Sequence, residues 1–208
     1  MASKYHLENS FIYLEGTDVP HNKLGITDSG ELHELECELL TEAYQVFSRE
    51  LDDNTLFDED YFKSLHRRTF TNLYEWAGEY RQFNMSKGGS RFCQGAYVAS
   101  SSNKLFAEFA KQNYLKNNGL PKSEFVRQLA YFKCELIALH PFYELNGRIT
   151  RLFFDLIVRY NNYSFIDYSG VSPEAYINAA IACVQFADCG LMEKIINDGL
   201  REWNDEIG

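Results

Sequence analysis

The chain has 208 residues, of which 30 are acidic and 20 basic, so its formal net charge is -10. Apolar residues make up 45% and charged residues 24%, a globular balance that excludes intrinsic disorder. This length suits one domain, and we expect a single domain over residues 1–208. Because nucleic acids and anionic membranes attract clustered Lys and Arg, the acidic surplus predicts neither as a partner.

Cysteine usage and hydropathy indicate the compartment. The five cysteines are an odd number without a C-x-x-C pair, so we expect neither a disulfide framework nor a zinc site. Residues 1–8 lead into no apolar run of the kind that marks a secretory signal. The most apolar stretch, residues 175–187, is shorter than the ~20 residues of a membrane-spanning helix. The sequence predicts a soluble protein of the reducing cytoplasm, with export by a leaderless route left open.

The pattern of the chain is mainly α-helical. Gly and Pro together number 17 of 208 residues, and strict two-residue alternation is scarce. Residues 1–30 carry turn signals and predict an irregular arm. Apolar residues at three- and four-residue spacings predict helices, and Ser123 is expected to cap one of them. The expected helices cover 31–51, a segment from 58, 102–116, a segment from 123, a segment from 146 or 147, 172–186 and 191–203.

The pattern changes between residues 80 and 97. Two short apolar segments flank the sequence Lys87-Gly88-Gly89-Ser90. A glycine pair between two such segments is typical of a tight turn between antiparallel strands. The sequence therefore predicts a β-hairpin over residues 80–97.

A histidine ends the helix that starts near Ser123. Pro141 follows His140 directly, and a residue before proline avoids the helical region, so the helix should stop there. The imidazole would lie at the C-terminal end of the helix, beside the apolar face that contains Leu136 and Leu139. A lone histidine in such a place more often packs or caps than reacts. Its role therefore depends on the segment that follows.

Two arginines lie in the first turn of the next helix. Asn146 is expected to cap this helix, and Arg148 and Arg151 then lie on nearly the same face. Cations there oppose the positive end of the helix dipole, at a cost of ~0.3–1 kcal/mol each, so a negative group should compensate. The N–H groups of a helix start, the adjacent Gly147 and two guanidiniums together suit a phosphate.

Glu144 leaves two interpretations open. It could form a simple ion pair with the arginines. It could equally hold Mg²⁺ that bridges a polyphosphate, because Mg²⁺ takes one or two carboxylates plus phosphate oxygens. In that case His140 could accept a proton from a hydroxyl that attacks phosphorus. The physical argument alone favours neither interpretation.

Residues 140–151 read HPFYELNGRITR. This segment resembles the signature of the Fic (filamentation induced by cyclic AMP) family, H-P-F-x-[D/E]-G-N-G-R-x-x-R, at every specified position but one. Further likeness lies in residues 16–18, 22–26, 74–79 and 87–92, in the order usual for bacterial Fic proteins. The resemblance implies an all-helical Fic fold with a small β-hairpin flap. It also implies transfer of AMP from ATP to a Tyr, Thr or Ser hydroxyl of a target protein.

The same resemblance implies a role for each signature residue, with ATP and Mg²⁺ as the cofactors. By position, His140 would be the general base and Glu144 the Mg²⁺ ligand. Asn146 and Gly147 would form the anion hole. Arg148 and Arg151 would bind the β- and γ-phosphates.

Two kinds of protein partner follow from the resemblance. The hairpin would be a flap that aligns the backbone of the target by strand addition, with Lys87, Gly88, Gly89 and Arg91 as its candidate docking residues. Many family members also carry an inhibitory helix with the pattern [S/T]-x-x-x-E-[G/N]. Residues 4–9 and 27–32 come nearest to this pattern, and each departs from it at one place. A separate small antitoxin-like inhibitor is therefore possible.

Leu145 stands where the family has its first glycine. If the position needs a positive φ, leucine costs roughly 1–2 kcal/mol, and its side chain could crowd the phosphates. We expect Leu145→Gly to raise adenylylation, whereas an equal or lower rate would show that leucine is accommodated. Two other functions stay open: a Fic-fold transferase of another group, such as phosphate or a different nucleotide, and a degenerate module that binds a nucleotide or a partner without turnover.

Overall fold

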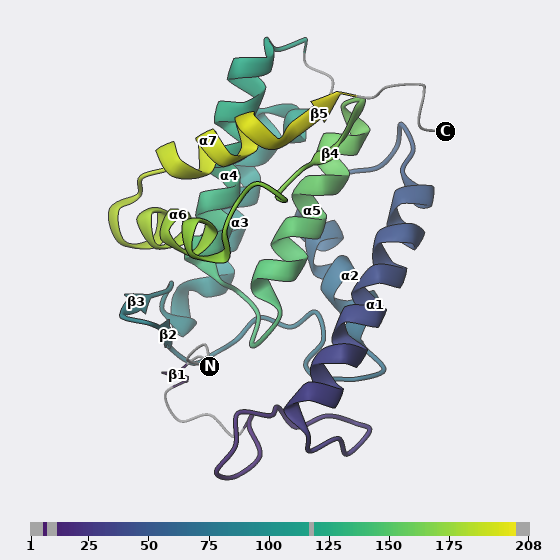
Figure 1. The fold of residues 1–208 in the computed structure, drawn as a ribbon, viewed down its shortest axis with the longest axis vertical. Helices are drawn as coiled ribbons and strands as arrows, with labels where there is room; N and C mark the ends of the chain where they lie inside the picture. The colour runs from purple at the N-terminus through teal and green to yellow at the C-terminus, as the bar shows by residue number, and fades with distance from the viewer. Residues whose placement is uncertain (1–5, 8–11, 117–118, 203–208) are drawn as a thin grey trace.

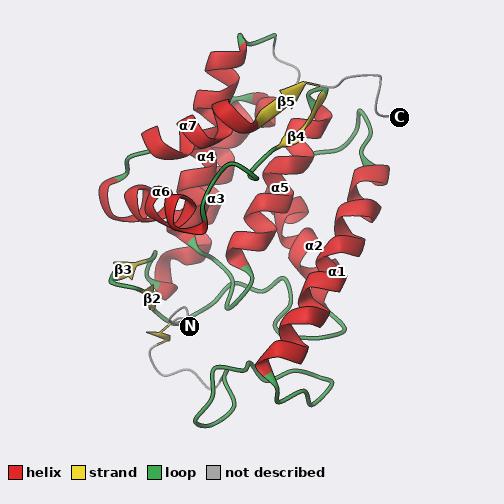
Figure 2. Cartoon of the chain, viewed as in Figure 1, coloured by secondary structure: helices red, strands yellow, loops and turns green. Residues whose placement is uncertain are grey.

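The computed structural model describes residues 6–7, 12–116 and 119–202 (Figure 1). These residues form seven α-helices and two small sheets, so the expected mainly α fold is confirmed (Figure 2). The helices are α1 Ser29–Glu50, α2 Glu59–Phe70, α3 Val98–Lys111, α4 Lys122–Leu139, α5 Asn146–Tyr160, α6 Pro173–Phe186 and α7 Gly190–Gly199, with 3-10 turns at Gly95–Tyr97 and Asn113–Leu115. The strands are β1 His6–Leu7, β2 Met85–Lys87, β3 Ser90–Arg91, β4 Tyr163–Ile166 and β5 Leu200–Glu202.

Helix α5 lies at the centre of the bundle, between α1 and α2 on one side and α4 on the other (Figure 1). It is apolar around most of its circumference, so neighbours can cover it from several sides. The ring of Phe153 contacts aromatic rings from α2, α3 and the loop before α2, namely Phe57, Phe62, Phe106 and Phe109. This aromatic core fixes the helix whose first two turns carry the two signature arginines.

Side-chain caps set the start of three helices. Asp28, Asp58 and Ser172 each accept a backbone N–H bond at the first turn of α1, α2 and α6. The prediction that Ser123 caps a helix is wrong, because α4 begins at Lys122 and Pro121 takes the cap position, two residues before the predicted cap. Helix α3 also starts and ends earlier than the expected range 102–116.

The hairpin expected over residues 80–97 is present. Strands β2 and β3 pair antiparallel with Lys87 opposite Ser90, and Gly88 and Gly89 both have positive φ, as a two-residue hairpin turn requires. The N-terminal arm adds a strand that no local pattern predicted. β1 pairs antiparallel with the other side of β2, so the sheet has the order β1-β2-β3.

The last expected helix, 191–203, is shorter than predicted. It ends at Gly199, and the next residues form β5, which pairs with β4. A Cβ at Gly199 would lie 2.4 Å from the carbonyl oxygen of Asp167, so glycine allows the two backbones to approach here. Arg201 then pairs with the Asp167 carboxylate at 3.0 Å. Tertiary contacts of this kind end the helix, and apolar periodicity does not report them.

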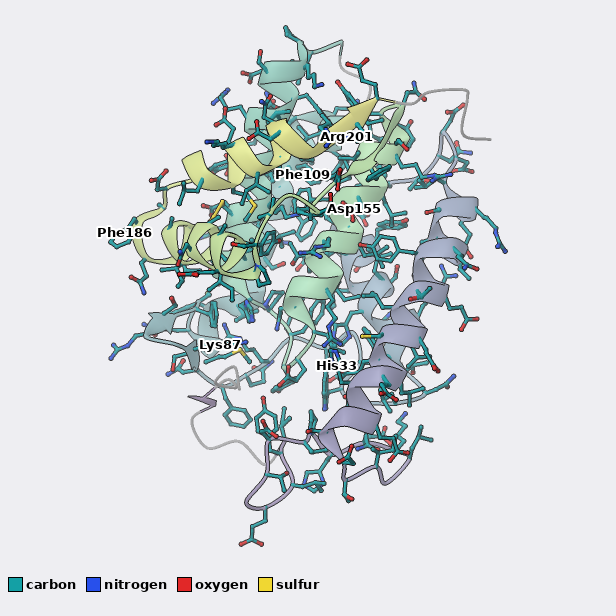
Figure 3. All side chains as sticks on the ribbon, viewed as in Figure 1. His33, Lys87, Phe109, Asp155, Phe186 and Arg201 are labelled. Atoms are coloured by element: carbon teal, nitrogen blue, oxygen red, sulfur yellow. A yellow bond between two sulfur atoms is a disulfide. The ribbon has the colours of Figure 1, made fainter. Side chains whose placement is uncertain are left out.

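The cysteines depart from the expected pattern. A disulfide joins Cys134 of α4 to Cys183 of α6, although the odd number of cysteines predicted no disulfide framework (Figure 3). The two residues are 49 positions apart and meet because α4 packs against α6. Among the helices that the structure describes, none combines the length and apolarity needed to cross a bilayer.

Candidate active site

The loop between α4 and α5 carries the signature segment. His140 takes the cap position of α4 in the left-handed conformation, at φ 47°, so the helix ends where Pro141 predicts. The Asn146 side chain then closes the loop: its Oδ1 accepts from the N–H of Phe142, and its Nδ2 donates to the carbonyl of Phe142, both at 2.7 Å. Asn146 is thus the first residue of α5 and not its cap, which corrects the predicted position.

A histidine of α2 holds the same loop from inside the protein. His66 is fully buried, and its Nδ1 accepts from the N–H of Gly78 at 3.0 Å. The proton therefore lies on Nε2, which donates to the carbonyl oxygen of Glu144 at 3.2 Å. Glu144 is 78 positions away in the chain, so no local pattern could assign this role.

The His140 imidazole lies beneath the flap. It stacks on the ring of Phe92 with the centroids 3.8 Å apart, and the residue is 6% exposed. Its Nδ1 donates to the carbonyl of Ile137 at 3.2 Å, which leaves Nε2 as the acceptor atom. Burial lowers the pKa of His140 to about 3, and the charges of Arg81 and Lys87 act in the same direction. The imidazole is therefore neutral near pH 7, with Nε2 unprotonated.

A fully buried arginine ties the flap to the signature loop. Arg81 donates through Nε to the carbonyl of His140 at 2.7 Å and through Nη2 to that of Leu139 at 3.1 Å. Its terminal nitrogens also donate to the carbonyls of Phe83 and Cys93, on either side of the hairpin. Burial lowers its pKa to about 10, so the guanidinium stays charged at pH 7. One side chain thus holds the flap over the histidine.

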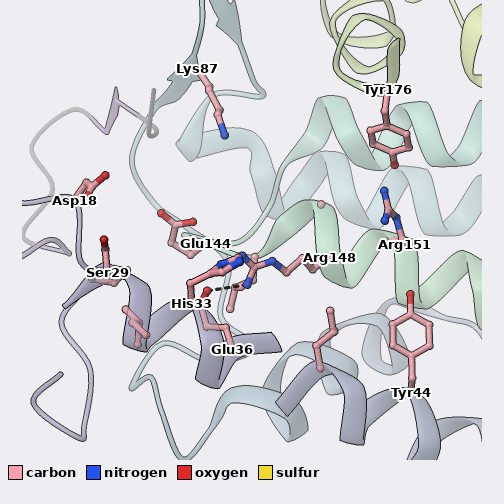
Figure 4. A pocket seen from close by; sticks show the side chains of 15 residues that line it. Asp18, Ser29, His33, Glu36, Tyr44, Lys87, Glu144, Arg148, Arg151 and Tyr176 are labelled. Atoms are coloured by element: carbon pink, nitrogen blue, oxygen red, sulfur yellow. Dashed lines mark hydrogen bonds and ion pairs between the residues drawn. The ribbon is translucent and has the colours of Figure 1, made fainter. Parts of the chain in front are cut away.

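A cavity of about 700 Å³ lies over the start of α5 (Figure 4). Lys87, Glu144, Arg148 and Arg151 line it, together with Gly147. A Cβ at Gly147 would meet nothing within 4 Å, so the space over the helix start is open. The first N–H groups of a helix have no acceptor inside it, and this end of the dipole attracts anions. The structure therefore brings the carboxylate, the glycine and both guanidiniums of the signature into one cavity.

Helix α1 holds the first of these arginines. Arg148 donates through Nη1 to the Glu36 carboxylate at 2.7 Å and through Nη2 to His33 Nδ1 at 2.9 Å (Figure 4). Glu36 is 8% exposed, and its other oxygen accepts from the Tyr74 hydroxyl at 2.6 Å. The negative group that compensates Arg148 is therefore Glu36. The Glu144 carboxylate instead accepts from the hydroxyl of Tyr13 at 2.5 Å.

Aromatic rings hold the second arginine. The guanidinium carbon of Arg151 lies 4.4 Å from the centroid of the Tyr168 ring and 4.9 Å from that of Tyr176. Tyr176 belongs to α6 and also lines the cavity, where Figure 4 shows it facing Arg151. The two guanidiniums thus reach one cavity from separate supports, α1 for the first and the segment of Tyr168 and α6 for the second.

A second cavity of about 360 Å³ adjoins the first, because Lys87, Gly147 and Tyr176 line both. His140 and Asn146 border it on the side of the signature loop. A charged cavity beside an apolar one fits a ligand with a polyanionic end and an apolar end. The apolar wall consists of Phe92, Ile137, Ile177, Ala180, Ile181 and Val184.

The four flap candidates separate into two pairs. Lys87 lines both cavities, and Gly88 lines the apolar one. Arg91 is exposed and lines a different hollow, and Gly89 borders neither of the two cavities. Lys87 and Gly88 therefore lie at the site, whereas Gly89 serves the turn and Arg91 lies away from the site.

Leu145 occupies a position with φ 65° and ψ 10°, the left-handed conformation that glycine adopts without strain. Its side chain is 6% exposed and belongs to the hydrophobic core, although it also borders the larger cavity. The expectation of a positive φ is thus confirmed. Because the side chain packs in the core and also borders the larger cavity, the rise in adenylylation expected for Leu145→Gly stays a prediction.

Leu145→Gly should lower the stability of the protein. Relief of left-handed strain favours the variant by roughly 1–2 kcal/mol, whereas loss of a buried leucine costs about 2–5 kcal/mol. We expect a net loss of about 1–3 kcal/mol, measured by urea unfolding. Leu145→Ala loses the packing but keeps the strain, so it should be less stable than Leu145→Gly. A glycine variant more stable than the parent would contradict this balance.

Two buried histidines make the protein sensitive to acid. Burial lowers the pKa of His66 to about 4 and that of His140 to about 3, below the ordinary unfolded value of about 6.5. The unfolded chain then binds more protons, so stability present above pH 6.5 is lost as the pH falls toward 4. Between pH 7 and 4.5 we expect each histidine to remove about 2 kcal/mol. Urea unfolding of His66→Asn should show about 2 kcal/mol less loss over this range than the parent, and an equal loss would refute the assignment.

Comparison with known proteins identifies the family. The Fic/DOC family model matches residues 56–158. A probable protein adenylyltransferase of Sinorhizobium fredii, y4lH, is 33% identical over 178 residues, which cover 86% of this chain and 90% of that protein. The chain belongs to the Fic/DOC family. A second Fic/DOC relative, the protein adenylyltransferase VbhT of Bartonella schoenbuchensis, is 33% identical over 90% of this chain and 38% of its own length.

Solved structures establish the same fold for this Fic/DOC chain. The BepC protein of Bartonella tribocorum, crystallised with bound AMPPNP, gives a TM-score of 0.80 at 22% identity and covers 93% of this chain and 97% of that one. The N-terminal Fic domain of a Bartonella quintana protein, crystallised with ADP, gives 0.80 at 24% identity over 93% of this chain and 95% of that one. The predicted Fic fold is thus confirmed.

Proposed function

We propose that the chain is a protein adenylyltransferase, which transfers AMP from ATP to a hydroxyl side chain of a target protein. Relatives that match most of the chain bear this name, and one of them is matched over 90% of its own length. The observation that carries the proposal is the cavity over the start of α5, where Glu144, Arg148 and Arg151 surround open space beside His140.

The two cavities suggest how ATP would lie. The triphosphate would occupy the larger cavity, with the backbone N–H groups of Asn146 and Gly147 as donors to its oxygens. Arg148 and Arg151 would hold the β- and γ-phosphates from their supports on α1 and α6. The nucleoside would enter the apolar cavity, whose walls come from α4, α6 and the flap. This orientation brings the α-phosphate next to the His140 side of the helix start.

Glu144 fits a magnesium ion. Its carboxylate lines the open space over Gly147, and carboxylate plus phosphate oxygens form the donor set that Mg²⁺ prefers. Among the residues the structure describes, no group of three or more His, Cys, Asp or Glu side chains could hold a metal by itself. This donor set suits a metal that binds together with the polyphosphate. When bound, the ion would screen the negative charge of the phosphates.

His140 would serve as the general base. The target hydroxyl oxygen forms a bond to the α-phosphorus and passes its proton to Nε2 of the neutral imidazole, while the bond from that phosphorus to the bridging oxygen of the β-phosphate breaks. Pyrophosphate leaves, and its added charge is stabilised by Arg148, Arg151 and the positive end of α5. The hydrogen bond from Nδ1 to the Ile137 carbonyl fixes the tautomer that this step needs.

Protein partners complete the proposal. A Tyr, Thr or Ser of the target would enter beside the flap, whose strands align the extended backbone around it by strand addition. Lys87 and Gly88 lie nearest to this path. A small antitoxin-like inhibitor would act on the same cavity from outside. The need for ATP favours the cytoplasm as the compartment of the reaction, whereas the Cys134–Cys183 disulfide is a feature of oxidising compartments.

Mass spectrometry of lysate proteins incubated with the chain, ATP and Mg²⁺ tests this proposal. Gain of an AMP group on a Ser, Thr or Tyr residue supports it. Gain of a phosphate would identify a Fic-fold transferase that binds ATP in the opposite orientation, with the terminal phosphate beside His140. Binding of ATP in calorimetry without any gain of mass would identify a nucleotide-binding module without turnover.

A further inference from the structure

The flap has two edges, and both are covered within the described residues. β3 lies against α6, where Gln185 Nε2 donates to the Ser90 hydroxyl at 3.1 Å. β2 lies between β3 and β1, with His6 opposite Ser86 and Leu7 opposite Met85. A target that adds a strand to the flap must therefore displace one of these neighbours.

The polar groups of β2 show which neighbour a target would replace. The carbonyl of Met85 accepts from the N–H of Phe92 at 3.1 Å, so the backbone groups of Met85 face β3. In an antiparallel ladder the backbone groups of successive residues face opposite edges. The N–H and C=O of Ser86 therefore face His6, and the bond that β1 makes here is the bond an added strand would make.

The N-terminal arm that includes β1 reaches the site at a second point. The hydroxyl of Tyr13 donates to the Glu144 carboxylate at 2.5 Å, and Tyr13 is itself held by a β-bridge to Pro20. Glu144 is the residue proposed to bind Mg²⁺. One segment of the chain thus contacts both the strand edge of the flap and the carboxylate of the cavity.

We propose that the outer edge of β2 is the docking edge for an extended segment of the target, and that residues His6–Leu7 cover it as an intramolecular competitor. The inference rests on the proposed adenylyl transfer. β1 has two paired residues, whereas β3 is joined to β2 by the hairpin turn and packs on α6. The arm is therefore the neighbour that an incoming backbone replaces.

A reversible disulfide between β1 and β2 tests this competition. Residues opposite each other in a hydrogen-bonded pair have Cα atoms about 5.5 Å apart, a spacing that a disulfide spans. His6→Cys combined with Ser86→Cys should lock β1 onto β2 when oxidised. Labelling of lysate proteins with ATP radioactive at the α-phosphate should then fall to the background of His140→Ala, and dithiothreitol should restore it. The single variants His6→Cys and Ser86→Cys control for the effect of the reductant on the other cysteines.

The opposite change should open the edge. His6→Pro removes an N–H from the pair with Ser86, whereas His6→Ala keeps the backbone pairing and serves as the matched control. If β1 covers the edge about nine tenths of the time, opening it raises the competent fraction about tenfold. We expect His6→Pro to label lysate proteins about tenfold faster than His6→Ala, and the Ser86 amide to exchange its hydrogen faster by mass spectrometry.

The outcomes separate this inference from the proposed function. Full labelling by the oxidised double-cysteine variant would refute the proposal that β2 is the docking edge. Equal labelling and equal Ser86 hydrogen exchange in His6→Pro and His6→Ala would refute it as well. Absence of label in every variant, with ATP still bound in calorimetry, would instead contradict adenylyl transfer. In that case the hydrogen exchange of the Ser86 amide still tests whether β1 covers β2. Exchange that is slow in the parent and fast in His6→Pro supports the covering, and exchange at the same rate in both proteins refutes it.

Discussion

His140→Ala should reduce the rate of AMP incorporation by about 10²–10⁴-fold, the range that a positioned general base contributes. The neutral imidazole lies at the border of the apolar cavity and keeps its proton on Nδ1, so Nε2 is the atom that takes the proton of the target hydroxyl. The variant leaves the arginines and the start of α5 in place. ATP affinity in calorimetry should therefore stay close to that of the parent.

His21→Ala is the matched control for this experiment, because His21 is exposed and borders neither cavity over the helix start. It should label targets at the parental rate. Retained ATP binding shows that His140→Ala is folded, which separates loss of the base from loss of the structure. Incorporation at the parental rate by a folded His140→Ala protein would remove His140 from the mechanism.

Arg81→Met should have the largest effect on stability. The guanidinium satisfies carbonyl oxygens of four residues, and a buried acceptor left without a partner costs about 1–3 kcal/mol. We expect the free energy of unfolding to fall by about 4 kcal/mol or more, a size that indicates a broken buried network. By calorimetry the melting temperature should fall by roughly 8–16 °C, because each kcal/mol corresponds to about 2–4 °C at this chain length.

Arg49→Met controls for the loss of one positive charge. Arg49 is exposed near the end of α1, and exposed substitutions usually change stability by less than about 0.5 kcal/mol. Arg81→Met should also lower adenylylation beyond its effect on stability, since the same side chain holds the flap over His140. A melting temperature within a few degrees of the Arg49→Met protein would show that the four carbonyls find other partners.

Local features of the sequence predicted the parts of the site that depend on local chemistry. Proline after His140 predicted the end of α4. The glycine pair predicted the hairpin. Each prediction follows from the φ and ψ values that one residue or its neighbour allows, so a short window of sequence contains all the information needed.

The supports of the site could not be predicted in this way. Glu36 meets Arg148 across 112 positions of sequence, and Arg81 meets Leu139 across 58. Such pairs depend on how the helices pack, and a buried polar residue has no periodic signature of its own. Asn146 illustrates the limit on a smaller scale: its residue type indicated a cap, whereas its amide closes the loop through Phe142.

We propose that the start of α5 holds the triphosphate of ATP with its α-phosphate beside His140. A crystal structure of the protein with Mg²⁺ and a non-hydrolysable ATP analogue would decide this. We expect the phosphate chain over Gly147, the metal on Glu144, the base in the apolar cavity and the α-phosphorus as the phosphorus nearest Nε2 of His140. A terminal phosphate in that place, or a nucleotide bound outside these two cavities, would contradict it.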